Sequence, residues 1–495
     1  MEHFDVVIVG AGLSGIGAAA HLKVECPEKS FMILEGRAAS GGTWDLFRYP
    51  GIRSDSDMFT LGYRFRPWTD PKAIADGAAI LEYIRETADE YEISEKIRCN
   101  TRVRNASWLS DEALWTVEAE TENSTVHFTC NFLYLCTGYY DYESGYTPEW
   151  ADMNRFRGRI VHPQKWTEDI DYAGKRVVVI GSGATAVTLV PALAERAAHV
   201  TMLQRSPTYV VSRPTEDKIA NRIRAFLPAR AAYAVSRWKN ILLGIFFYNL
   251  ARKQPSVMKR LIAKGVKKEL GADFDTKHFT PNYNPWDQRL CLVPDSDLFR
   301  AIRNGRASIV TGEIETFTET GLRLKSGEQL ESDLIVTATG LVLKLMAGLQ
   351  LVVDGAPVDI SKTLAYKGMM YSDVPNAASA FGYTNASWTL KCDLTAEYVC
   401  RLLKFMDKNG YAQCTPRVND ESIEAEPVLD FTSGYVQRAI DTLPRQGSKT
   451  PWRLHQNYVK DVAMLRFGRL DDGAMEFKKA TPAHYPNGKA EQQSL

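Results

Sequence analysis

The chain has 495 residues, enough for roughly two to four domains with substantial hydrophobic cores. Its 60 Lys and Arg residues balance 60 Asp and Glu residues, so the zero net charge gives no reason to expect nucleic acid as a partner. The eight cysteines form no C-x-x-C pair, which argues against a redox dithiol or a cysteine-based zinc site. We therefore expect reduced thiols and no bound metal.

The N-terminus enters an apolar run almost directly, without the basic and apolar regions of a signal peptide. The longest apolar run, 241–248, falls far short of the roughly 18 to 20 residues that span a bilayer. These features predict a cytoplasmic protein.

A strand, a glycine turn, a helix and a second strand are predicted at the start of the chain. The strand over 4–9 leads into Gly10, Gly12 and Gly15, and the second strand ends in Glu35 about 20 residues later. Glycines at this spacing let the backbone approach a diphosphate, and a carboxylate in this place accepts hydrogen bonds from a ribose. The acid disfavours a 2′-phosphate, so the pattern predicts FAD or NAD rather than NADP at this first site.

The next loop places Gly41 and Gly42 before Trp44. Glycines before an indole let the backbone approach a planar ring, although an ordinary loop with a packed tryptophan has the same pattern. Periodicity then predicts a helix over 77–91 and a β-hairpin over 97–117.

Two buried strands close on Thr-Gly turns about 200 residues apart, at 137–138 and 339–340. This recurrence predicts an internal duplication in which each of two nucleotide-binding folds ends in such a turn.

The second fold has its own glycine turn, 181–187, after the apolar strand 177–180. Its next strand, 199–204, ends in Arg205 and Ser206 instead of an acid. Arginine and a hydroxyl can hold a 2′-phosphate, which predicts NADPH at this second site, although an arginine at a strand end can also serve solubility.

A helical insertion in the second fold is predicted over about 215–275. The stretch 218–268 contains thirteen Lys and Arg residues and no acid, and Pro228 and Pro255 divide it into helices. Such helices could lie on an anionic membrane surface, or they could pack on the protein with a solvated basic face.

Two nucleotide sites in one chain suggest a flavin reduced by a nicotinamide, and the lack of a dithiol favours oxygen as the electron acceptor. A string of aromatic, glycine and histidine residues before the second turn resembles the fingerprint of the Baeyer–Villiger monooxygenases, which are class B flavoprotein monooxygenases. Its members are Phe156, Gly158, His162 and Trp166. The runs 41–55 and 284–289 are similar to those of the ethionamide-activating members of that family.

The resemblance covers nearly the whole chain and implies an α/β fold of two three-layer Rossmann-like dinucleotide-binding domains, with the helical insertion in the second. Residues 1–140 and 341–495 would form the FAD-binding domain, and 141–340 the NADPH-binding domain. The expected FAD contacts are Gly10, Gly12, Ser14, Gly15, Glu35, Gly42, Thr43, Trp44, Asp45, Leu46, Asp55 and Val103. The expected NADPH contacts are Arg53, Ser54, Asp55, Gly181, Ser182, Gly183, Ala184, Thr185, Ala186, Val187, Arg205 and Ser206.

By the same resemblance, Arg289 is the main catalytic residue and Asp55 orients it. A guanidinium keeps its charge, so it would stabilise an anionic C4a-peroxyflavin and the adduct formed with a ketone. As an alternative reading, Arg289 is an ordinary surface ion-pair residue. The fingerprint string would couple domain position to the flavin's redox state. Two departures from the family pattern are Thr167, where proline or aspartate is usual, and Gln288, where a lysine is common.

The implied function is NADPH- and O2-dependent oxygen insertion into ketones, giving esters or lactones, together with oxidation of sulfides and thioamides. One alternative is an S- or N-oxygenating flavin monooxygenase with little ketone activity. A second is a flavin redox sensor without turnover at a membrane surface, in contact through 218–268.

Overall fold

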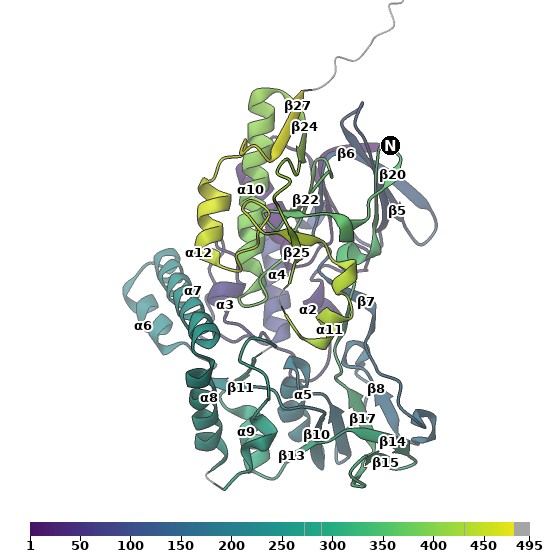
Figure 1. Ribbon diagram of the computed structural model, residues 1–495, viewed down its shortest axis with the longest axis vertical. Helices are drawn as coiled ribbons and strands as arrows, with labels where there is room; N and C mark the ends of the chain where they lie inside the picture. Colours follow the sequence, from purple (N-terminus) through teal and green to yellow (C-terminus); the bar gives the residue numbers. More distant parts are fainter. Residues whose placement is uncertain (272, 289, 430, 480–495) are drawn as a thin grey trace, which may run out of the picture.

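Two lobes make up the computed structural model, which describes residues 1–479 other than 272, 289 and 430. Figure 1 shows an upper lobe built on the N-terminal sheet and a lower lobe built on a second, parallel sheet. Helices α6 (Lys218–Phe226) and α7 (Ala229–Lys253) project at the left between the lobes, joined to the lower one through α8 (Pro255–Leu270).

The upper lobe is organised around strands β1 (Glu2–Val9), β2 (Phe31–Leu34) and β6 (Thr125–Leu135), which are parallel neighbours. Val9 pairs with both Leu34 and Leu135, so the carboxyl ends of the three strands meet at one edge. The full strand order is β20 (Ala356–Pro357), β19 (Gln350–Val353), β4 (Arg102–Leu109), β5 (Leu114–Glu120), β6, β1, β2 and β3 (Ile97–Arg98), with β23 (Ala377–Ser379) paired to β6. The predicted hairpin is confirmed as the antiparallel pair β4 and β5.

Both faces of this sheet are buried at the carboxyl end of β1, which explains why residues 6–9 are a continuous apolar run. Because side chains alternate along a strand, Val6 and Ile8 face one core while Val7 and Val9 face another. The first core is covered by α1 (Leu13–Glu25), α4 (Gly77–Glu90) and α10 (Trp388–Asn409). The second core is lined by Trp108 of β4, Trp115 of β5 and Leu351 of β19, so β1 is covered by helices on one face and by these strands on the other.

The lower lobe repeats this plan with the parallel strand order β13 (Ala307–Thr311), β10 (His199–Gln204), β9 (Arg176–Ile180), β17 (Leu334–Thr337) and β8 (Arg159–Val161). One face packs on α5 (Ala184–Ala194) and α9 (Asp297–Arg303), and the other on the antiparallel strands β14 (Ile314–Thr318), β15 (Gly321–Leu324) and β16 (Gln329–Glu331). The predicted fold of two Rossmann-like units is confirmed, since each lobe has a parallel sheet with helices packed on it.

The helical insertion forms as the prolines predict. Pro228 immediately precedes α7 and Pro255 is the first residue of α8, positions where the missing N–H costs no helical hydrogen bond. Helix α7 packs on α3 (Met58–Leu61) of the upper lobe as well as on α6 and α8. Within the described residues, none of the helices is both long and apolar enough to span a membrane.

The chain passes between the lobes on two strands that pair with each other. They are β7 (Tyr140–Gly145) and β18 (Leu341–Leu343), which run antiparallel. The chain therefore enters and leaves the lower lobe through two neighbouring strands. This geometry suits a hinge.

Candidate nucleotide-binding and oxygenation site

The first glycine turn packs tightly against the end of β6. Gly10 has φ +104°, and a Cβ at this position would lie 2.6 Å from the carbonyl oxygen of Cys136. A Cβ at Gly15 would lie 1.9 Å from the carbonyl oxygen of Gly10. Only glycine fits this turn, and the Ser14 hydroxyl donates a hydrogen bond to the same Cys136 carbonyl (3.3 Å). The backbone at the carboxyl edge of β1 is thereby left open to a diphosphate.

Glu35 lies at the same edge, directly after β2, and is buried. Its two carboxylate oxygens accept hydrogen bonds from the N–H groups of Ala11 (2.7 Å) and Arg37 (2.9 Å). Burial raises the pKa of Glu35, and these hydrogen bonds oppose the rise. A carboxylate has about four acceptor positions, so it can still accept hydrogen bonds from ribose hydroxyls.

The Gly-Gly-Thr-Trp segment lies across the first turn. A Cβ at Gly42 would come 2.9 Å from the Cα of Gly12, and α2 (Thr43–Leu46) begins there. The hydroxyl of Tyr140 donates to Thr43, a contact that the sequence did not indicate. Trp44 and Leu46 are half-buried, and Val103 is buried in β4.

Asp45 positions this segment through charge. Its buried carboxylate forms ion pairs with Arg37 (2.8 Å), Arg48 (2.9 Å) and Arg85 (2.9 Å). Three cations on one buried acid hold α2 against the upper lobe, so the side chain of Asp45 supports the loop instead of pointing into solvent.

The second glycine turn repeats the geometry of the first. Gly181 has φ +136°, and a Cβ there would lie 2.3 Å from the carbonyl oxygen of Ala338, at the end of β17. Gly183 is exposed, with no atom of the described chain within 4 Å of an added Cβ. Arg205 and Ser206 follow β10 and are exposed at the same edge. Ser182, Ala184 and Thr185 are half-buried, whereas Ala186 and Val187 belong to the core.

The loop 47–55 of the upper lobe rests on the lower lobe. A Cβ at Gly51 would lie 2.7 Å from the Cβ of Ala192 in α5. Burial raises the pKa of Tyr49 to about 12, although its hydroxyl has a hydrogen-bond partner in Thr185 of the second turn. This loop therefore brings the two predicted sites together.

Arg53, Ser54 and Asp55 end this loop in different environments. Arg53 forms an ion pair with Asp297, the first residue of α9, which no sequence motif singled out. Ser54 is buried and bonded to Ser56, whereas Asp55 is exposed. Arg53 is thus held at the boundary of the lobes.

Arg289, the residue expected to be catalytic, lies outside the described residues. The loop before it is anchored on two sides. Asp287 forms an ion pair with Arg252 of α7 (2.8 Å), and its carbonyl accepts the N–H of Thr432 (3.0 Å). After it, the thiol of Cys291 donates to the carbonyl of Ser182 (3.7 Å). The described residues on either side of position 289 therefore contact α7 and the second glycine turn.

His162 contacts both strands that cross between the lobes. Its Nδ1 accepts the N–H of Gln164 (3.2 Å), and its Nε2–H donates to the carbonyl of Gly340 (3.1 Å), which precedes β18. A Cβ at Gly145, the last residue of β7, would lie 1.9 Å from the imidazole ring. Burial lowers the pKa of His162, and these bonds define a neutral imidazole with its proton on Nε2.

The other members of the fingerprint string are packed into the lower lobe. Phe156 and Trp166 are buried on opposite sides of its sheet. A Cβ at Gly158 would lie 2.5 Å from the carbonyl oxygen of Asp333, just before β17. The string therefore fixes the strand β8, and with it His162, to the sheet.

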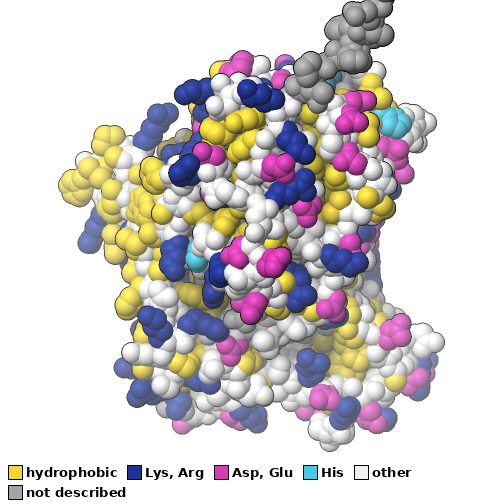
Figure 2. Space-filling view, turned by 45° about the horizontal axis from the view of Figure 1, so that its top comes forward, with side chains coloured by type: hydrophobic (Ala, Val, Ile, Leu, Met, Phe, Trp, Pro, Cys, Tyr) yellow, Lys and Arg dark blue, Asp and Glu magenta, His cyan; other side chains and the backbone are white. Residues whose placement is uncertain are grey.

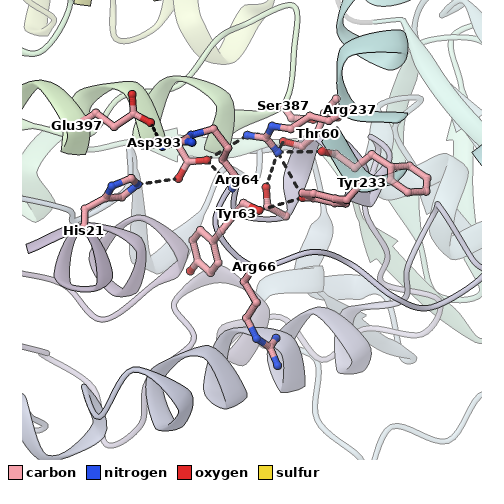
Figure 3. Close-up of polar contacts among 12 residues, drawn as sticks. His21, Thr60, Tyr63, Arg64, Arg66, Tyr233, Arg237, Ser387, Asp393 and Glu397 are labelled. Atoms are coloured by element: carbon pink, nitrogen blue, oxygen red, sulfur yellow. Dashed lines mark hydrogen bonds and ion pairs between the residues drawn. The ribbon is translucent and has the colours of Figure 1, made fainter. Parts of the chain in front are cut away.

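A buried ion cluster joins α7 to the upper lobe, and sequence reasoning missed it. Arg237 of α7 contacts Asp393 of α10 (3.1 Å), as Figure 3 shows. Its guanidinium also donates to the carbonyls of Phe59 (2.8 Å) and Gly62 (2.7 Å). Asp393 also contacts His21 of α1 (3.4 Å). Its attraction, with that of Glu25, outweighs burial and raises the pKa of His21 to about 9.

Comparison with known proteins agrees with this geometry. Residues 70–370 match the family described as flavin-binding monooxygenase-like, and residues 8–70 match an NAD(P)-binding Rossmann-like domain. FAD-containing monooxygenase EthA of Mycobacterium tuberculosis is 55% identical over 480 residues, which is 97% of this chain and 98% of EthA.

Two solved structures share the fold. Oxidized steroid monooxygenase bound to NADP is 20% identical with a TM-score of 0.74, covering 96% of this chain and 100% of that one. The OTEMO complex with FAD and NADP is 19% identical with a TM-score of 0.74, covering 96% and 99%. With its two Rossmann-like folds and this near full-length similarity, the chain belongs to the flavin-binding monooxygenase-like family.

Proposed function

We propose that the chain is an FAD-containing, NADPH-dependent monooxygenase with FAD at the first glycine turn and NADPH at the second. One observation carries the proposal: the two turns have the same backbone geometry, but a buried acid, Glu35, follows one and an exposed cation, Arg205, follows the other. An acid suits the plain ribose of FAD, and a cation suits the 2′-phosphate of NADPH. The FAD-containing relatives support the same assignment.

The proposed domain division follows from the same sites. Residues 1–140 and 341–495 would bind FAD, and residues 141–340 would bind NADPH. The paired crossings β7 and β18 support boundaries near these positions.

The chain's own residues would bind, orient and stabilise charge. When bound, NADPH-reduced FAD supplies activated oxygen from O2. Arg289 would stabilise the negative charge that develops on a ketone oxygen, because a guanidinium stays charged and offers several donors. Asp55 would orient Arg289, and the loop 47–55 would hold the two cofactors together while the closed lobes exclude water.

The proposed substrates are ketones, converted to esters or lactones, and also sulfides and thioamides. The fingerprint string 156–166 supports the ketones, and the similarity of the runs 41–55 and 284–289 to ethionamide-activating monooxygenases supports sulfur oxidation. The second candidate, sulfur oxygenation with little ketone activity, needs the same cofactors. Peripheral membrane contact through 218–268 belongs to the proposal and has its support in the exposed basic and apolar side chains there.

A paired substrate test separates the two candidates. The holoenzyme is incubated with NADPH, O2 and either a linear ketone or a thioether, and products are identified by mass spectrometry. Ester from the ketone supports Baeyer–Villiger oxygenation, whereas sulfoxide as the sole product rejects it.

The role of Arg289 has its own test. Arg289→Ala should retain reduction of FAD by NADPH while product formation falls by at least about a hundredfold, the usual loss for one charge-stabilising group. Stopped-flow absorbance measures the reduction and product analysis the oxygenation. Normal product yield from Arg289→Ala would show that another group stabilises the charge.

A further inference from the structure

An unusual concentration of exposed apolar side chains covers α6 and α7. Phe226 is 84% exposed, Phe246 59% and Leu242 55%. Other exposed apolar residues in these two helices and their connection are Ile219, Leu227, Val235, Trp238, Leu243 and Phe247. Large apolar patches on a protein surface generally mark a binding surface for another apolar phase.

These side chains form one face of α7. Val235, Trp238, Leu242 and Phe246 follow each other at intervals of three or four residues, so they line one side of the helix. The opposite side, which includes Arg237, is buried on the upper lobe. Helix α7 is therefore packed on one face and apolar but exposed on the other.

The charged residues within these helices have one sign. The segment 218–268 holds thirteen of the chain's 60 Lys and Arg residues and none of its 60 Asp and Glu residues. Three of the cations, Arg237, Lys239 and Arg252, form ion pairs with acids outside the segment. Lys218, Arg222, Arg230, Lys253, Lys264, Lys267 and Lys268 are exposed and form no ion pair with a described residue.

The two properties occur on the same projecting part of the molecule. Figure 1 shows α6 and α7 standing away from both sheets, and Figure 2 shows hydrophobic side chains gathered at that edge with Lys and Arg at their margin. Apolar side chains bordered by cations are the pattern of helices that lie in the interface of an anionic bilayer.

We propose that α6 and the exposed face of α7 form a docking surface for an anionic lipid bilayer. The inference rests on the proposed function, which includes membrane contact through 218–268. It adds which side chains enter the bilayer and that the lipid headgroups are anionic. A second copy of the chain fits less well, because a two-fold contact would place the same cations against each other. An anionic surface instead attracts these cations while Phe226, Leu242 and Phe246 enter the headgroup region.

The position of α7 gives docking a consequence for the proposed site. Asn240 donates to Asp57 (2.9 Å), two residues beyond Asp55, and Arg252 pairs with Asp287, two residues before Arg289. The docked helix is thus bonded to both loops that carry the proposed catalytic residues.

Vesicle sedimentation of the full-length holoenzyme tests the surface. The probe is a phosphatidylcholine vesicle with about 30% phosphatidylglycerol, compared with pure phosphatidylcholine and with about 0.5 M salt. The wild type should sediment with the anionic vesicles alone, and high salt should release most of it. The double variant Phe226→Ser/Phe246→Ser should lower the ratio of bound to free protein by at least about tenfold.

Leu109→Ser is the matched control, because Leu109 is exposed (44%) at the end of β4. Its hairpin partner β5 lies on the opposite side of the molecule from α7 in Figure 1. It should bind vesicles as the wild type does. A wild type that stays in the supernatant, or a double variant that binds equally well, overturns the inference. So does light scattering that finds a dimer broken by the double variant, without vesicle binding, since a second copy would then cover the face.

The same preparations keep the two proposals separable. FAD content and NADPH-dependent oxygenation of a water-soluble substrate, measured without vesicles, should match the wild type in the double variant. Vesicle binding without any oxygenation would reject the proposed function and support the docking surface. Oxygenation without vesicle binding would support the proposed function and reject the docking surface.

Discussion

At the scale of single residues, Gly181 lets the backbone of the second glycine turn pack closely against the end of β17. Gly181→Ala should raise the KM for NADPH more than about tenfold, because φ +136° and the Ala338 carbonyl at 2.3 Å leave no room for a Cβ. FAD content should be unchanged. Gly305→Ala is the control, since Gly305 also has positive φ (+71°) but no described atom near its Cβ. Equal KM values in both variants would contradict the site.

Arg205 is expected to read the 2′-phosphate. Arg205→Ala should raise the KM for NADPH at least about tenfold and leave the KM for NADH nearly unchanged, because only NADPH carries the additional charge. Arg323→Ala, an exposed cation of β15 in the same lobe, should change neither constant. A parallel loss with both nicotinamides would rule out the phosphate contact.

His21 gives the buried ion cluster a measurable pH dependence. Its pKa is raised from 6.5 to about 9, so its stabilising contribution is complete below pH 6.5 and is lost as pH rises through about 9. The difference in free energy of unfolding between wild type and His21→Gln should therefore shrink by up to about 3 kcal/mol across this range. Urea unfolding at several pH values measures it. A difference independent of pH would mean that His21 is neutral in the folded protein.

The sequence was a good guide to residues that act through the backbone or through local spacing. Gly10, Gly181 and Glu35 lie where the motifs placed them, because motif spacing fixes which backbone groups meet at a strand's carboxyl edge. Asp297 and Tyr140 were missed, since each acts on a residue far away in the chain and neither stands in a motif. The structural position of Arg289 stays a prediction from resemblance.

At the scale of elements, α7 belongs by sequence to the lower lobe but is joined to the upper lobe by the buried ion pair of Arg237 and Asp393. Arg237→Met should lower the free energy of unfolding by about 3–5 kcal/mol, because it removes one of the two cations that contact buried Asp393, leaving His21, and leaves two carbonyls without their donor. Chemical denaturation measures the loss. Arg222→Met, on the exposed side of α6, should cost less than about 0.5 kcal/mol.

A double variant makes the Arg237 prediction specific. Arg237→Met/Asp393→Leu should recover part of the lost stability, because both charges leave the interior together. Additive losses in the two single variants would show that Arg237 and Asp393 are not energetically coupled.

The helices of the insertion could be predicted because prolines and a long amphipathic pattern mark their ends. Their docking could not. Arg237 stands in the sequence as one of thirteen similar cations, and only the fold reveals that it is 3% exposed beside Asp393. Tertiary contacts therefore decide which face of α7 is buried, and which face remains for the proposed membrane surface.

At the scale of the whole molecule, the paired crossings and His162 form the proposed hinge between the lobes. Gly145→Ala would displace the imidazole, since its Cβ would lie 1.9 Å from the ring. We expect NADPH oxidation to continue while the yield of oxygenated product per NADPH falls at least about twofold. With the lobes misplaced, the enzyme would reduce O2 to hydrogen peroxide instead of oxygenating the substrate. Gly327→Ala, at an open turn of the lower lobe, should keep the wild-type yield. Unchanged yield in Gly145→Ala would separate His162 from domain coupling.

The presence of two similar folds could be predicted because both repeat the same local motif. The repeat includes the Thr-Gly turn after the closing strand. The contact between the lobes could not be predicted, because Tyr49, Gly51 and Arg53 contact α5 and α9, which lie more than a hundred residues later in the chain. A loop shared between two such folds can join a flavin and a nicotinamide, which is the basis of the proposed chemistry.

The most direct test follows the oxygen atom. Wild-type holoenzyme is supplied with NADPH, 18O2 and a linear ketone, and the label in the product is compared with the NADPH consumed. We predict an ester that carries one labelled oxygen atom for each NADPH oxidised. Consumption of NADPH that yields only labelled hydrogen peroxide, with the ketone unchanged, would contradict the account.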